Sequence, residues 1–472
     1  FGLVRESLRE RRILEDIAPH LVYPLPFLIP TYRSLSSNRF ILKAGMILYD
    51  LLSWDKTFTR HRSKKIPAHR SLSAAEVMRI SPQVPAENLT GGQMYFDCQS
   101  IFPERLTLAF LKSAVAHGAR VSNYAQVVGF ERNADGNLGA AQVVDHLTGR
   151  KHKIQAKIFI NSAGPWVTRV QDKAQKSQAH AIRMSEGIHI IVPSLGKDHA
   201  LVMQTPDKRH FFLIPWREHT LIGTTDRDYM GDPDDYSVSR SSIEEFLREI
   251  NATFGRTLIR YQDIRFAYGG LRPLTDTHTQ SSYSSSRRYE IFDGEKTGTP
   301  GLITVEGGKY TTSRNLAETV VDLIAKKLKR KLRPSLTVLE PLYGGEMFHL
   351  EDFLKFAPGR FPQFASQTVQ TLARNYGTEF EHVLLLASNA ELMKPLNPEG
   401  EILAQVLYAV RSEMARSLSD VLLRRTGLGA LGHPGKKILE QTAKIMAREL
   451  DWSARSMQNQ IEQADAALRV PE

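Results

Sequence analysis

The chain has 472 residues, 42% of them hydrophobic and 24% charged, which excludes a disordered chain and predicts two or three folded domains. Its formal charge of +11 and pI near 9.5 favour anionic partners: phosphorylated substrates, acidic lipid surfaces or nucleic acid. The single cysteine, Cys98, excludes intrachain disulfides as well as CxxC zinc and redox motifs, and fits a reducing compartment.

Residues 3–21 carry apolar side chains at near-helical spacing, and the proline-rich residues 22–30 that follow predict an extended segment. The first residue is Phe1 and the helical pattern is already under way there, so we expect that an N-terminal part of the protein precedes this sequence. No window holds the roughly 18 uninterrupted apolar residues that a membrane-spanning helix needs.

Residues 40–54, FILKAGMILYDLLSW, predict a strongly apolar helix. Residues 56–70 follow with six Lys or Arg, two His and no acidic residue. An apolar helix beside a basic run is typical of a segment that lies in a membrane interface. A buried helix followed by a solvated loop would give the same pattern, so both interpretations stay open.

A helix that begins at Pro103 and ends near Gly118 is followed by short strands (residues 120–123, 125–132 and 138–147) with turn residues between them, the pattern of a β-meander. A further strand, residues 158–160, ends in NSAGPW. Small residues at the carboxyl end of a strand, before a helix, are where α/β sheets hold cofactors. A plain strand-to-helix corner is the alternative.

Residues 188–226 are rich in strand patterns and predict an antiparallel sheet, followed by a helix over residues 241–254. His189 lies in one apolar strand, where a histidine is more often structural than catalytic. Thr224 and Thr225 end another strand in the motif GTTD and are candidates to line a pocket.

Residues 301–318, GLITVEGGKYTTSRNLAE, predict a strand, a glycine turn and a helix start. Gly307 and Gly308 leave room for a ligand beside the backbone, and the first amides of the helix can receive an anion. Lys309, Arg272 after the glycine pair of GGLRPL, and Arg287 after a serine-rich hinge could converge on a phosphate. A solvated basic surface is the alternative.

Residues 334–345 predict a linker, and beyond residue 346 the pattern is mostly helical. Serine-triad and zinc-ligand patterns are absent from the sequence. Nucleic acid binding is disfavoured because no aromatic residues are interleaved with the basic run.

Seven stretches, in order along the chain, resemble the flavin-dependent, membrane-associated glycerol-3-phosphate dehydrogenases. They are APHLVYPLPFLIP, NSAGPWV, GIHIIVP, FFLIPW, LIGTTD, GGLRPL and VEGGKYTTSRNLAE. The resemblance implies a mixed α/β flavoprotein fold of the two-dinucleotide-binding type, with an antiparallel-sheet substrate domain and a C-terminal helical domain. It implies an FAD domain at about residues 1–20, 102–172 and 296–330, a substrate domain at about 21–101 and 173–295, and a helical domain at 346–472.

The resemblance also implies the activity: oxidation of sn-glycerol 3-phosphate to dihydroxyacetone phosphate with FAD, and transfer of the electrons to membrane quinone. It places the protein peripherally on the cytoplasmic face of the cell membrane, on an anionic lipid surface; a homodimer is one open oligomeric state. An oxidase that uses oxygen shares the same motifs and stays an alternative.

Site residues follow from the same resemblance. Cofactor contacts are implied for Ala163, Gly164, Trp166, Gly307, Gly308, Lys309, Thr311 and Thr312. Arg272 and Arg287 match arginines that hold the substrate phosphate, with Lys309, Thr224 and Thr225 beside them. His189 is our candidate for the base or hydroxyl orienter, with Lys309 as the competing candidate.

One departure from the family pattern concerns the first strand, GxGxxG turn and helix that receive the FAD pyrophosphate. This sequence contains no such motif, and Phe1 matches a point well inside the family pattern. Either the sequence is a fragment, or the product is a truncated, inactive membrane-surface protein.

Overall fold

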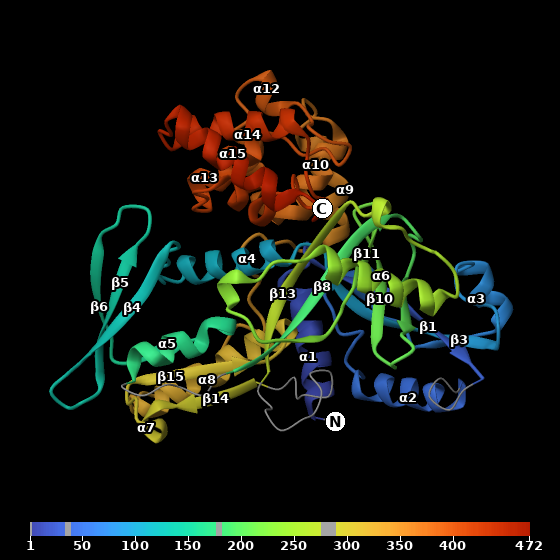
Figure 1. The fold of residues 1–472 in the computed structure, drawn as a ribbon, viewed down its shortest axis with the longest axis horizontal. Helices are drawn as coiled ribbons and strands as arrows, with labels where there is room; N and C mark the ends of the chain where they lie inside the picture. The colour runs from blue at the N-terminus through green and yellow to red at the C-terminus, as the bar shows by residue number, and fades with distance from the viewer. Residues whose placement is uncertain (1, 34–38, 176–181, 275–288) are drawn as a thin grey trace.

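The computed structural model describes residues 2–33, 39–175, 182–274 and 289–472. Strands and helices of the first 330 residues form one body, and the C-terminal helices form a second body that packs against it (Figure 1). The mixed α/β architecture with a C-terminal helical domain, as predicted from the sequence, is confirmed.

Nine of the described strands form a large sheet, in the order β12-β8-β11-β10-β9-β1-β3-β2 with β13 paired to β8. Their bounds are β1 Val22–Tyr32, β2 Arg70–Leu72, β3 Leu89–Ser100, β8 Arg183–Pro193, β9 Ala200–Gln204, β10 His210–Trp216, β11 His219–Gly223, β12 Arg227–Tyr229 and β13 Phe266–Leu274. One face is apolar and packs against α6 (Arg240–Phe254), where Ile190, Phe211 and Phe246 share one core. Because strand side chains alternate, residues such as His189 project from the opposite face.

A smaller sheet has the order β14-β15-β7, with β14 at Tyr289–Asp293, β15 at Leu302–Gly307 and β7 at Phe159–Asn161. β15 and β7 run parallel, with Leu302 beside Phe159, so their carboxyl ends lie at the same edge. Short 3-10 helices follow both strands at that edge: η2 (Gly164–Trp166) leads into α5 (Val167–Ala174), and η6 (Tyr310–Thr312) leads into α8 (Ser313–Lys327).

The predicted meander is the antiparallel sheet β4-β5-β6, at Ala125–Arg132, Leu138–Asp145 and Lys151–Gln155. Residues 120–123 are not a strand, so that part of the prediction was wrong. The remaining elements of this body are α1 Gly2–Ile17, α2 Arg39–Leu52, η1 Arg62–Lys64, α3 Ala74–Ile80, α4 Pro103–Ala116, η3 Pro233–Asp235, η4 Tyr261–Asp263 and α7 Gly294–Thr297.

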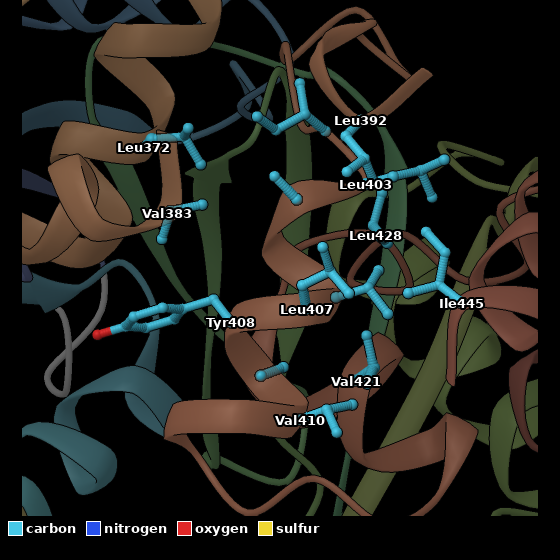
Figure 2. Packing of buried hydrophobic residues seen from close by; sticks show 14 of the residues in the cluster. Leu372, Val383, Leu392, Leu403, Leu407, Tyr408, Val410, Val421, Leu428 and Ile445 are labelled. Atoms are coloured by element: carbon cyan, nitrogen blue, oxygen red, sulfur yellow. The ribbon is translucent and has the colours of Figure 1, made fainter. Parts of the chain in front are cut away.

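The C-terminal body consists of α9 Leu350–Arg360, α10 Ser366–Tyr376, η7 Gly377–Glu379, α11 Phe380–Leu385, α12 Ala390–Met393, α13 Ala404–Ser412, the π-helix η8 Asp420–Arg425, α14 Lys436–Glu449 and α15 Ala454–Leu468. Figure 2 shows its core, where Leu372, Val383, Leu407 and Val421 come from four different helices. A buried ion pair ties this body to the first: Nη1 of Arg105 in α4 lies 2.7 Å from Oε1 of Glu413.

Helix α2 has no buried residue, and Phe40, Ile41 and Leu51 are exposed on it. The interpretation of this segment as a plain buried helix was therefore wrong. In the described ranges no helix is both long enough and apolar enough to cross a membrane. The basic run that follows α2 in the sequence, residues 56–70, is not uniformly solvated either. Lys64 is fully buried, and its ammonium donates to the carbonyls of Pro19 and Val22.

Candidate active site

His189 lies in the middle of β8, between Gly223 of β11 and Tyr268 of β13, its partners in register on either side. Its imidazole stacks on the Tyr268 ring, with centroids 5.3 Å apart and planes 12° apart. Burial, and then the positive charge of Arg272, lower the pKa of His189 to about 4. The imidazole is therefore neutral near pH 7 and able to accept a proton.

Arg272 lies four residues beyond Tyr268 on β13, so both side chains project from the same face of the sheet. Its guanidinium reaches back across β8: Nη2 donates to Oγ1 of Thr224 at 2.8 Å, and Nη1 donates to the carbonyl of Thr225 at 3.3 Å. Ser185 lies opposite Arg272, with Oγ 3.4 Å from Nη1. These contacts hold a planar cation beside the imidazole, an arrangement suited to a phosphate or carboxylate.

Thr224 and Thr225, predicted to line the pocket, thus hold Arg272 in the structure. Thr225 also anchors the sheet, because its Oγ1 accepts the amide hydrogen bond of Ile188 at 3.0 Å. Arg287, predicted to act beside Arg272, lies outside the described residues.

The predicted flavin-contact segments meet at the carboxyl edge of β7 and β15. Ala163 and Gly164 follow β7. Gly307 ends β15 and Gly308 follows it, with φ angles of 70° and 97°, a left-handed conformation that favours glycine. Strand β13 contacts both β15 and η2, which brings this edge next to the Tyr268 and Arg272 side of the large sheet.

Lys309 and the threonines stand at the same edge. Lys309 is the N-terminal flanking residue of η6, Thr311 lies within that helix, and Thr312 is buried with Oγ1 donating to the carbonyl of Lys309 at 3.3 Å. Trp166 closes η2, and its indole donates to Asp234 at 2.8 Å. The predicted cofactor residues are therefore neighbours in two adjoining turns.

Aromatic side chains around this edge are left partly uncovered: Tyr268 is 38% exposed and Tyr310 is 45% exposed. The Tyr310 hydroxyl is tied to Oγ1 of Thr107 in α4 at 2.9 Å. Glycine turns that admit a ligand to the backbone, helix starts and uncovered rings suit a flat, charged cofactor at the end of parallel strands. The residues present therefore fit the isoalloxazine part of a flavin.

Sequence reasoning missed three residues of this site: Tyr268, Gly223 and Ser185. The signal for Tyr268 was present, because in FAYGGLRPL it stands at an alternate position to Arg272 and so shares its face. Gly223 and Ser185 become visible only through strand register, which the sequence does not show.

Comparisons with known families identify the class of protein. Residues 1–322 match the model of FAD-dependent oxidoreductases, and residues 335–457 match the C-terminal domain of alpha-glycerophosphate oxidase. Since the first match covers more than half of the chain, the protein is an FAD-dependent oxidoreductase.

Individual relatives narrow the class. A glycerol-3-phosphate dehydrogenase from Synechocystis is 35% identical over 98% of this chain and 85% of its own length. One from Pseudomonas aeruginosa is 33% identical over 93% of this chain and 82% of its own length. The structure of the Bacillus halodurans glycerol-3-phosphate dehydrogenase complexed with FAD is 27% identical, with a TM-score of 0.79 over 98% of this chain and 84% of that one. The chain belongs to the FAD-dependent glycerol-3-phosphate dehydrogenase family, as its motifs indicated.

Proposed function

We propose that the protein oxidises sn-glycerol 3-phosphate to dihydroxyacetone phosphate with FAD and passes the electrons to a membrane quinone. The observation that carries this proposal is the neutral imidazole of His189 and the guanidinium of Arg272 on one face of one sheet. A hydroxyl acceptor and an anion holder beside the flavin edge are what oxidation of a phosphorylated alcohol needs.

Arg272 supplies the positioning. Its hydrogen bonds to Thr224 and Thr225 fix the fork before substrate arrives, so little side-chain freedom is lost on binding. A phosphate held there keeps the carbinol carbon in one orientation relative to the imidazole. Arg287, which lies outside the described residues, is proposed as a second phosphate contact on the family pattern alone.

His189 supplies the proton acceptor. Being neutral, it can take the hydroxyl proton as the C2 carbonyl forms, and a bound phosphate dianion next to Arg272 would raise the low imidazole pKa toward the working pH. FAD, when bound, supplies the hydride acceptor. Ala163, Gly164, Trp166, Gly307, Gly308, Thr311 and Thr312 would hold it.

Lys309 is the second candidate for the proton acceptor because it stands at the end of β15, a strand that contacts β13. The two candidates differ in the pH dependence that they impose, since an imidazole titrates well below an ammonium. Comparison of His189→Gln with Lys309→Met therefore separates them: the variant that abolishes the acid limb of kcat/KM identifies the base.

Attachment to an anionic membrane surface is proposed for the α2 patch, formed by the exposed residues Phe40, Ile41, Ile47, Leu48, Leu51, Trp54 and Phe58. Exposed basic residues, Arg39, Lys43, Arg60, Arg62, Lys65 and Arg70, flank it. An amphipathic helix with cations beside its apolar face suits peripheral binding at the cytoplasmic leaflet, where quinone is dissolved.

The test of the function is turnover of sn-glycerol 3-phosphate by the FAD-loaded protein. Reduction of a soluble quinone without hydrogen peroxide formation supports the dehydrogenase. Stoichiometric hydrogen peroxide instead identifies an oxidase, and a protein that binds FAD but leaves the substrate unchanged contradicts the proposal.

A further inference from the structure

Three glycines lie on the sheet face between and beneath the side chains of His189 and Arg272. On the face that carries both side chains, β8 presents Gly187, β11 presents Gly223 and β13 presents Gly270, with Gly270 opposite Gly187. None of the three has a φ angle in the left-handed region. Any residue could adopt the backbone conformation of these three glycines. The space available above each of them, and not its φ angle, must therefore explain why the position carries no side chain.

Two of these glycines seat the functional side chains. A Cβ on Gly223 would lie 2.0 Å from Cδ2 of His189, and a Cβ on Gly187 would lie 1.8 Å from Nη2 of Arg272. The imidazole of His189 therefore packs directly against the backbone of Gly223, and the guanidinium of Arg272 packs against that of Gly187.

Gly270 is different, because a Cβ there would meet no atom of the described residues within 4 Å. A side chain would fit the protein and would project from the site face, between its alternate neighbours Tyr268 and Arg272. Packing within the described structure therefore gives no reason for glycine at this position, which leaves the space beside it for a ligand.

The spacing of the two functional groups defines the length of that ligand. The guanidinium lies over Gly187, two residues from His189 on β8, and two residues of a strand span about 6.6 Å. A hydroxyl on the carbon next to a phosphate-bearing carbon bridges such an interval when each group makes a hydrogen bond. Gly270 borders the same interval, since its register partner is Gly187.

We propose that Gly270 is a specificity-determining residue, whose missing side chain keeps the interval between the imidazole and the guanidinium open to an unbranched three-carbon alcohol phosphate. The inference rests on the proposed function, because it assigns the two ends of the interval to a hydroxyl and a phosphate. It predicts that added volume at residue 270 blocks substrate without disturbing the fold.

The experiment compares the FAD-loaded wild type with Gly270→Ala and Gly270→Val. We expect KM for sn-glycerol 3-phosphate to rise about ten-fold or more in Gly270→Ala and further in Gly270→Val, as one misplaced methyl group does in a fitted pocket. Inhibition by inorganic phosphate, which needs only the Arg272 end, should stay unchanged. The rise in thermal midpoint caused by sn-glycerol 3-phosphate should shrink, while the midpoint without ligand stays the same.

Gly196→Ala is the matched control. Gly196, between β8 and β9, also lacks a left-handed φ angle, and a Cβ built on it also meets no described atom within 4 Å, but it lies outside the site. Wild-type KM and ligand-induced stabilisation in both Gly270 variants would overturn the inference, and so would an equal loss of phosphate inhibition. A wild type that does not turn the substrate over contradicts the proposed function instead, and the thermal shifts still decide on Gly270.

Discussion

Tyr268 lies flat on His189 across the β13–β8 pair, with ring centroids 5.3 Å apart. Within the described residues no hydrogen bond to another protein group orients the imidazole, so its position depends on this ring and on the bare backbone of Gly223. Stacking of this kind contributes about 0.5–1.5 kcal/mol beyond area burial. Tyr268 is therefore expected to position the base.

Replacement of Tyr268 tests this role. Tyr268→Leu should lower kcat by roughly ten- to a hundred-fold through misplacement of the imidazole, whereas Tyr268→Phe, which keeps the ring, should retain most activity. In NMR spectra the His189 ring protons should move downfield in Tyr268→Leu only. If Tyr268→Phe and Tyr268→Leu lose activity equally, the hydroxyl and not the stacking is what matters.

Removal of the Arg272 charge should weaken substrate binding and should also change the pKa of His189. Arg272→Gln loses a charge-assisted phosphate contact, so KM should rise roughly a hundred-fold. Because burial and the Arg272 charge lower the His189 pKa to about 4, loss of that charge should raise it. Catalysis requires the neutral imidazole, so the acid limb of kcat/KM should move to higher pH.

Arg240→Gln is the control for this variant, since Arg240 forms an exposed pair with Glu244, with Nε 2.8 Å from Oε1. It should leave both KM and the pH profile unchanged. An unshifted acid limb in Arg272→Gln would show that the guanidinium charge does not reach His189.

Local sequence patterns were sufficient for the elements that carry the site. The turn in VEGGKYTT predicted a strand-turn-helix unit, which is present. For Arg272 the pattern GGLRPL indicated only a position after a glycine pair, and the structure places that residue in β13. The contact between Tyr268 and His189 could not be predicted because it depends on register between strands 79 residues apart.

The burial of charged side chains was the second feature that local sequence patterns could not predict. Lys64 lies in a run of cations that resembles a solvated loop, yet it is buried. Two carbonyls accept hydrogen bonds from its ammonium, and its Nζ lies 3.7 Å above the Tyr23 ring. Val321 on α8 shows the reverse, since it is apolar but 50% exposed. The carbonyls and the ring that surround Lys64 come from a distant segment, which a local sequence pattern does not contain.

The α2 patch should bind anionic vesicles. Leu51 and Trp54 are 66% and 63% exposed, so Leu51→Glu and Trp54→Glu should weaken sedimentation with phosphatidylglycerol vesicles without loss of stability. Salt should weaken wild-type binding because part of the attraction is electrostatic. Leu385→Glu is the control, since Leu385 is 74% exposed on the C-terminal body. Equal binding to neutral vesicles would argue against a role for the flanking cations.

The Arg105–Glu413 pair should couple the two bodies. Both side chains are buried, and the Arg105 guanidinium also donates from Nε to the carbonyl of Asn375 at 3.1 Å. Arg105→Met leaves the buried Glu413 charge with only the ammonium of Lys112, 3.8 Å from Oε1, which should cost about 3–5 kcal/mol of unfolding free energy. Calorimetry should then resolve separate transitions for the two bodies. In the double variant with Glu413→Met much of the loss should be recovered; the same loss as in the single variant would mean that packing and not charge is responsible.

Glu401 should make stability depend on pH. Its carboxylate is fully buried, and burial is the main reason that its pKa rises to about 7, although Arg217 and the amide of Gly427, 2.8 Å from Oε1, oppose the rise. The folded protein therefore retains a proton that the unfolded chain releases near pH 4.5, so stability present below that pH is lost as pH rises to about 7, by on the order of 3 kcal/mol.

Glu401→Gln keeps the acceptor for Gly427 but cannot ionise. Its unfolding free energy, measured with denaturant from pH 4.5 to 7.5, should fall less than that of the wild type, and parallel curves would show that Glu401 is already ionised in the folded protein at the low end of this range.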